Sequence, residues 1–171
     1  MLVRSPDVAQ LSSLSPKLIW QFFEQICSIP HPSKHAAQLS AWIVAWAQGE
    51  GLAVKQDAVG NIIIKKPATP GMENRKAVVL QAHIDMVPQA NADTQHDFTK
   101  DPIDAYIDGE WVTARGTTLG ADNGMGMAGC LAVLADKTIK HGPLEVLLTT
   151  DEETGMTGAF GLEAGWLEGE I

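Results

Sequence analysis

The chain has 171 residues, of which 45 % are hydrophobic, and this indicates one globular domain with an apolar core rather than a disordered chain. Twenty-one acidic side chains against twelve basic ones give a formal charge of −9, which argues against a nucleic-acid-binding surface. No apolar run reaches the ~20 residues of a membrane-spanning helix, and the N-terminus lacks the apolar stretch of a secretory signal. Cys27 and Cys130 are isolated, so we interpret them as small buried residues of a cytoplasmic protein.

Two amphipathic helices are predicted in the first third of the chain. Ser15 and Pro16 favour a helix start, and apolar residues then recur at a spacing of three to four as far as Ile26. The stretch IPHPS interrupts this pattern. Ser33 is a candidate N-cap of the second helix, which should end near Gly49.

Short strands are predicted after these helices, over residues 52–57, 61–66 and 77–85. The third one begins with the continuous apolar run AVVL, which is typical of a strand covered on both faces. A polar loop follows. Residues 106–114 then predict a hairpin that turns at Asp108 and Gly109.

The last predicted elements are a helix over residues 120–136, which starts in a glycine-rich segment, and a buried strand over residues 143–153. The glycines match a dinucleotide-binding spacing, but no apolar strand precedes them, so we interpret them as sites of close packing. The order strand, loop, helix, strand favours a largely parallel sheet. The predicted fold class is α/β, with a partly parallel sheet flanked by helices, and residues 1–171 are expected to form a single domain.

Acidic residues and one histidine collect where these apolar elements end. His83 and Asp85 end one strand, Asp122 lies at the glycine-rich helix start, and residues 151–153 are all acidic at the end of the last strand. In open α/β sheets such groups converge beyond the carboxyl ends of the strands. Carboxylates brought together repel one another unless a cation lies among them. Imidazole with carboxylates suits zinc, with manganese or cobalt as alternatives.

Longer segments carry a family resemblance. HIDMV, GTTLGADNGMGMA and TTDEETGMTGA resemble the co-catalytic zinc aminopeptidase, carboxypeptidase and aminoacylase family, and most of all its dipeptidases that act on Xaa-His peptides. The similarity extends over nearly the whole chain from about Leu14. It implies metal-dependent hydrolysis of dipeptides such as β-alanyl-histidine by metal-activated water, two zinc ions in the complete enzyme, and a homodimeric full-length enzyme.

The resemblance also implies a role for each site residue. His83 and Glu153 would ligate opposite metals, and Asp122 would bridge the two. Glu152 would be the general base that activates water. Asp85 would orient the imidazole of His83 and counts among the catalytic residues.

Other implied features concern the neighbourhood of these residues and the extent of the chain. The Asp122–Asn123 peptide is expected to be cis, and Asp151 has no assigned role. The family pattern requires a further Asp and a further His as ligands, and a lid or dimerisation domain, at positions that this sequence does not contain. Residues 1–171 are therefore expected to be the N-terminal, C-terminally incomplete part of a zinc-peptidase catalytic domain.

Three functions remain open at this point. The first is the N-terminal part of an active dinuclear zinc dipeptidase. The second is a non-catalytic remnant, or a binding partner of a full-length relative, in which the ligand set stays incomplete. The third is a related deacylase of N-acyl amino acids with the same metal chemistry.

Overall fold

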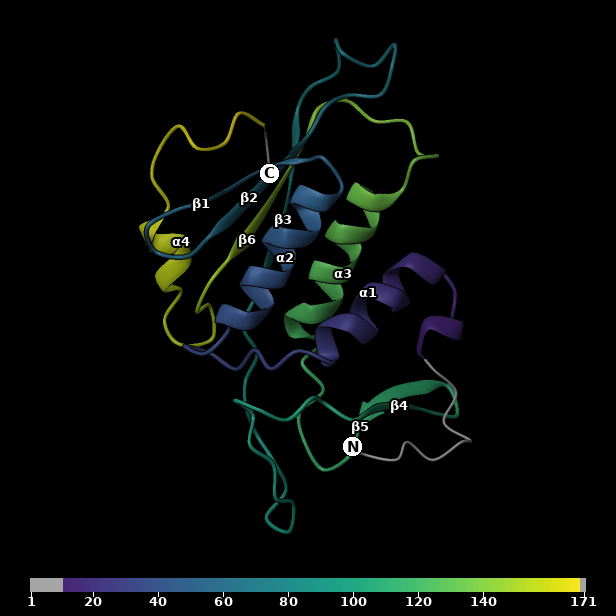
Figure 1. The fold of residues 1–171 in the computed structure, drawn as a ribbon, viewed down its shortest axis with the longest axis vertical. Coiled ribbons are helices and arrows are strands. Elements are labelled where there is room, and N and C mark those ends of the chain that lie inside the picture. Colours follow the sequence, from purple (N-terminus) through teal and green to yellow (C-terminus); the bar gives the residue numbers. More distant parts are fainter. Residues whose placement is uncertain (1–10, 170–171) are drawn as a thin grey trace.

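The computed structural model describes residues 11–169, and its elements follow the predicted order (Figure 1). Residues 1–10, which hold most of the N-terminal stretch considered for a secretory signal, and residues 170–171 lie outside the described part. None of the helices within residues 11–169 is long and apolar enough to cross a membrane. The elements are η1 (Leu11–Ser13), α1 (Lys17–Cys27), α2 (Ala37–Gly49), β1 (Ala53–Gln56), β2 (Ile62–Lys66), β3 (Val78–His83), β4 (Ala105–Asp108), β5 (Trp111–Ala114), α3 (Ala121–Ala135), β6 (Leu144–Thr149) and α4 (Thr157–Gly161).

The main sheet has four strands in the order β1-β2-β6-β3, and β4 with β5 forms a separate hairpin. β3 and β6 are parallel, whereas β2 pairs antiparallel with both β1 and β6. The partly parallel α/β sheet is confirmed, but the expectation of a largely parallel one was wrong. The physical reason is that residues 57–61 are too few for a crossover, so β1 and β2 can only form a hairpin.

Burial differs between the two parallel strands. All six residues of β6 are buried, because β6 is a central strand with neighbours on both sides. β3 lies at the edge of the described sheet, and its Val78 is exposed. The predicted covering on both faces is confirmed for the middle of β3, where Val79 is buried on one face and Ala82 on the other, but it does not extend to Val78 at the start of the strand.

The two faces of the sheet are covered unequally. Helices α2 and α3 pack on one face, α1 packs against α3, and the three helices enclose the main core (Figure 1). On the opposite face, Ile63, Val79 and Leu147 form a smaller cluster. Leu162, Trp166 and Leu167 of the C-terminal segment pack against that cluster.

Both cysteines are buried and free, as predicted. Burial raises the pKa of the Cys27 thiol to about 12 and that of Cys130 to about 11. Each is therefore a protonated, inert packing residue at neutral pH.

Candidate metal centre

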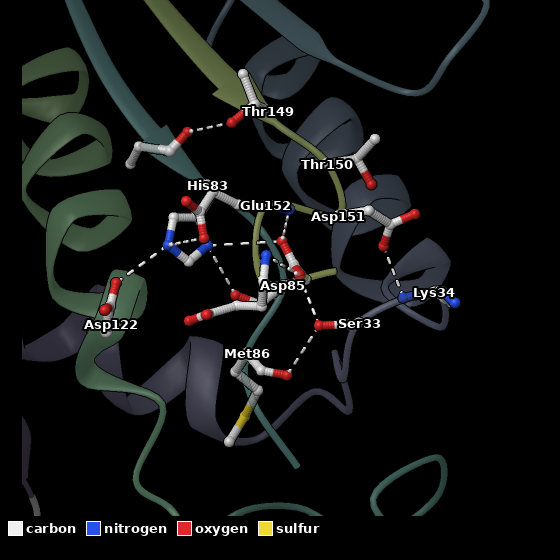
Figure 2. Close-up of polar contacts among 12 residues, drawn as sticks. Ser33, Lys34, His83, Asp85, Met86, Asp122, Thr149, Thr150, Asp151 and Glu152 are labelled. Atoms are coloured by element: carbon white, nitrogen blue, oxygen red, sulfur yellow. Dashed lines mark hydrogen bonds and ion pairs between the residues drawn. The ribbon is translucent and has the colours of Figure 1, made fainter. Parts of the chain in front are cut away.

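The parallel pairing of β3 with β6 brings the sequence-predicted residues to one edge of the sheet. The register pairs His83 with Thr149, so both strands end side by side. The loop after β6 then carries the glutamate pair, and α3 begins at the same edge with Asp122 (Figure 2). This is the crevice beyond the carboxyl ends of parallel strands, where α/β folds place their sites.

Three side chains at this edge are spaced as ligands of one cation. One ligand atom from each of His83, Asp122 and Glu153 lies within 4.8 Å of the other two. The imidazole Nε2 of His83 is 3.0 Å from Asp122 Oδ1 and 3.8 Å from Glu152 Oε2. One imidazole and two carboxylates form a donor set that suits zinc, and a third carboxylate, of Glu152, lies beside it.

His83 is buried and is held in one orientation. Its Nδ1 lies 3.0 Å from the backbone carbonyl of Asp85, and because a carbonyl only accepts, Nδ1–H is the donor. In the neutral ring Nε2 then keeps its lone pair and points toward Asp122 (Figure 2). Burial lowers the pKa of His83, but hydrogen bonds to Asp85 and Asp122 outweigh it and raise the pKa to about 9. A cation at this position would compete with that proton for Nε2.

Asp85 is fully buried and accepts several hydrogen bonds. Its Oδ1 accepts from the backbone N–H of Glu152 at 2.9 Å, and its Oδ2 accepts from the Ser33 hydroxyl at 2.6 Å. The N–H of Glu153 is 3.3 Å from Oδ2. Burial raises the pKa of Asp85, but its hydrogen bonds to His83, Ser33 and these two amides lower it well below its usual range. Asp85 is thus a carboxylate at neutral pH.

Ser33 was predicted to cap the second helix, and this was wrong. Helix α2 begins at Ala37, its N-cap position is Ala36, and no side chain caps it. The hydroxyl of Ser33 instead reaches Asp85, 52 residues further along the chain. No local pattern in the sequence indicates this contact, because a turn and a distant strand end share no periodicity.

The glutamate pair lies in an excess of negative charge. Burial, together with the carboxylate of Asp122, raises the pKa of Glu153. Within this group of carboxylates His83 is the one side chain that can carry a positive charge. The arrangement can bind a divalent cation through Glu153 and leave Glu152 free to accept a proton from a water molecule.

The backbone at the start of α3 presents Asp122 to this edge. Gly120 has a left-handed φ of 73°, and a Cβ there would lie 2.8 Å from the sulfur of Met86, so a tight entry to the helix requires glycine. The Asp122–Asn123 peptide is cis, as the resemblance implied. Gly124 packs against the ring of Phe23, which confirms close packing as the role of that glycine.

Asp151, which had no predicted role, links two loops. Its Oδ1 accepts from the backbone N–H of Lys34 at 2.6 Å, across 117 residues of sequence. Both residues have left-handed backbone angles, with φ of 52° for Asp151 and 67° for Lys34. Non-glycine residues adopt this conformation rarely, and aspartate does so more readily than lysine.

Comparison with known proteins identifies the family of this chain. The model of peptidase family M20/M25/M40 matches residues 79–170, which is more than half of the chain. The chain belongs to peptidase family M20/M25/M40. This family region begins within β3 and contains all five predicted site residues.

Two relatives of this M20/M25/M40 chain have high identity. The cytosol non-specific dipeptidase of Escherichia coli (strain K12) is 67 % identical over 164 residues, which are 96 % of this chain and 34 % of that protein. The crystal structure of aminoacylhistidine dipeptidase from Vibrio alginolyticus is 72 % identical with a TM-score of 0.94, and the match covers 95 % of this chain and 33 % of that one. The chain thus spans about a third of the length of these relatives.

A more distant structure shows the same fold. A tripeptidase from Staphylococcus aureus has a TM-score of 0.75 at 21 % identity, with 91 % of this chain and 42 % of that chain covered. At this identity the likeness concerns the fold alone.

Proposed function

We propose that this chain supplies part of the catalytic site of a metal-dependent dipeptidase. The observation that carries the proposal is the convergence of His83, Asp122 and Glu153, with ligand atoms within 4.8 Å of one another, next to the carboxylate of Glu152. These three residues would hold the metal, and in a two-metal site Asp122 would be the ligand shared by both ions. Zinc is the metal that this donor set favours, with manganese or cobalt as alternatives.

The chemistry follows from the positions of the remaining side chains. The metal, when bound, lowers the pKa of a water molecule and polarises the peptide carbonyl. Glu152 is close enough to the ligand cluster to take a proton from that water and to pass one to the leaving amine. Asp85 holds the backbone of Glu152 and Glu153, and it contacts the ring of His83.

The proposed substrates are dipeptides, with a preference for Xaa-His peptides such as β-alanyl-histidine. The two relatives with 67 % and 72 % identity support this class, since one is called a non-specific dipeptidase and the other an aminoacylhistidine dipeptidase. The word cytosol in the name of the Escherichia coli relative supports a cytoplasmic location. We propose the dipeptidase as a homodimer, with further metal ligands and a lid or dimerisation domain supplied by the part of the relatives that this chain does not match.

A chimera tests the activity directly. Residues 11–164 of this chain replace the corresponding segment of the Escherichia coli dipeptidase, and hydrolysis is measured on β-alanyl-histidine, on other dipeptides and on N-acetyl amino acids. We expect zinc-dependent cleavage of the dipeptides and a loss of at least about a hundredfold with Glu152→Gln. Cleavage of N-acetyl amino acids alone would instead support the deacylase, and a folded, zinc-loaded but inactive chimera would support the non-catalytic chain.

A further inference from the structure

The turn between α1 and α2 contacts, through Asp85, the edge of the sheet at which the proposed site residues lie. The Ser33 hydroxyl donates to Asp85 Oδ2 at 2.6 Å, and the same carboxylate accepts the backbone N–H groups of Glu152 and Glu153 (Figure 2). A second, longer contact at 3.4 Å joins the Ser33 hydroxyl to the carbonyl of Met86. Asp85 therefore connects Ser33 to the backbone that carries the proposed base and a proposed ligand.

The distances favour the loop over the ring as the main partner of the Asp85 carboxylate. Oδ1 of Asp85 lies 3.5 Å from His83 Nδ1 but 2.9 Å from the N–H of Glu152. The ring nitrogen has its shorter contact, 3.0 Å, with the backbone carbonyl of Asp85. The carboxylate is thus placed to hold the Glu152 amide more closely than the imidazole.

A second link joins the same turn to the same loop. The N–H of Lys34 donates to Asp151 Oδ1 at 2.6 Å. Lys34 directly follows Ser33 in the chain, and Asp151 directly precedes Glu152. The left-handed backbone of both partners is the kind of conformation that persists where surrounding contacts enforce it. The turn itself is pinned to the strand end, because Met86 N–H donates to His31 O and Ser33 N–H donates to Met86 O, each at 3.2 Å.

We propose that Ser33 is a positioning residue for the glutamate pair. Its hydroxyl orients Asp85, Asp85 fixes the amides of Glu152 and Glu153, and the contact between Lys34 and Asp151 is a second link of the same kind. The effect on metal binding rests on the proposed function, whereas the effect on the loop does not. This role goes beyond the orientation of His83, which the family resemblance assigned to Asp85.

Amide hydrogen exchange by NMR on the metal-free chain tests the link to the loop. In Ser33→Ala the amides of Glu152 and Glu153 should exchange about tenfold faster than in the unaltered chain, because a hydrogen bond to a charged acceptor is lost. The amides of β6 should keep their rates. Ser33→Thr restores a hydroxyl and should restore slow exchange.

Ser28→Ala is the matched control. It also removes one serine hydroxyl, which donates to Gln25 O at 2.6 Å at the end of α1, and it should leave the loop amides unchanged. Unchanged exchange of Glu152 and Glu153 in Ser33→Ala would overturn the proposal. Equal acceleration in β6 would also overturn it, since it would indicate only a loss of global stability.

Zinc affinity, measured by calorimetry on the same variants, tests the consequence for the site. Ser33→Ala should bind zinc about tenfold more weakly than the unaltered chain, as loss of an outer partner does at metal sites. An equal zinc affinity of Ser33→Ala and the unaltered chain would contradict the positioning role of Ser33. If the unaltered chain binds no zinc, because the further ligands are missing, the same comparison is made in the chimera, where absence of zinc binding would overturn the proposed function. The exchange experiment decides the positioning role in either case.

Two substitutions of Asp151 test the second link. Asp151→Asn keeps a carbonyl acceptor and tolerates the left-handed conformation, so the Lys34 amide should stay protected. Asp151→Ala removes the acceptor, and that amide should exchange faster. Equal protection of Lys34 in both variants would refute this link.

Discussion

Two buried carboxylates in this molecule have opposite surroundings. Glu145, on β6 at the face covered by the C-terminal segment, is 3 % exposed and lies 2.9 Å from the ammonium group of Lys65. Its other oxygen accepts the N–H groups of Glu168 and Gly169 at 2.8 and 2.7 Å. The charge of Glu145 is neutralised within the chain.

Asp85, at the edge of the same sheet, is 0 % exposed and also accepts two backbone amides. The side chain beside it that can carry a positive charge is His83, and the same ring also faces the carboxylates of Asp122, Glu152 and Glu153. The difference indicates which region is structural and which is a site. Where the chain neutralises a buried charge itself, no ligand is needed, whereas a surplus of carboxylates around one imidazole favours a bound cation.

The largest effect is expected from removing the buried carboxylate at the metal edge. Asp85→Ala leaves the amides of Glu152 and Glu153 and the hydroxyl of Ser33 without their acceptor. It should lower the free energy of unfolding by about 3–5 kcal/mol, as breaking a buried charged interaction does. Urea denaturation of the metal-free chain measures this. A loss below about 1 kcal/mol would show that Asp85 does not hold the loop.

Zinc should stabilise the folded chain, and this stabilisation should depend on the proposed metal ligands. At a hundred times its dissociation constant, zinc should raise the free energy of unfolding by about 2.7 kcal/mol. Glu153→Gln should lose most of this gain, while Glu145→Gln should keep it. Urea denaturation with zinc and with chelator gives both values. An equal gain in the two variants would place the metal elsewhere.

Glu145→Gln should have a smaller effect, confined to the structural region. It weakens the pairing with Lys65 and the two amide contacts, so we expect a loss of about 1–2 kcal/mol at neutral pH. Burial raises the pKa of Glu145, but the contacts with Lys65 and with the amides of Glu168 and Gly169 outweigh this effect. The net result is a pKa below the usual 4.5 of a glutamate. The stability it contributes is therefore present above pH 4.5 and is lost as pH falls through the lowered pKa.

The matched control for Glu145 is Glu168→Gln. The side chain of Glu168 is 78 % exposed and pairs with the same lysine, so its loss should change stability by less than about 0.5 kcal/mol. If both variants lose the same free energy of unfolding, burial is not the reason why the ion pair of Glu145 stabilises the fold.

The smallest effect has the opposite sign and comes from Glu153 in the metal-free chain. Burial and the Asp122 carboxylate raise the pKa of Glu153 above 4.5, so folding is favoured while the group is protonated. That stability is present below pH 4.5 and is lost as pH rises through the raised pKa. Glu153→Gln should therefore slightly stabilise the metal-free chain at pH 7, as measured by its melting temperature. A destabilised variant would mean that the glutamate is already neutralised by a partner.

Much of the fold and of the candidate site could be predicted because the relevant signals are local. Apolar periodicity predicted α1 and α2, a short apolar run predicted β6, and most of the acidic site residues lie directly after the strands that present them. The direction of the strands was predicted less well, since the parallel arrangement of β3 and β6 was extended to β1 and β2 despite their short connection. The five-residue α4 went unpredicted because so short a helix has almost no periodicity.

The sequence by itself determined the α/β class, the order of the longer elements and the set His83, Asp85, Asp122, Glu152 and Glu153, whose roles remain predictions. Only the tertiary structure decided what holds that set in place. The hydroxyl of Ser33 on Asp85 and the amide of Lys34 on Asp151 join a turn to loops 52 and 117 residues away. Contacts of that span depend on how the helices pack against the sheet, and packing leaves no repeating pattern in the chain.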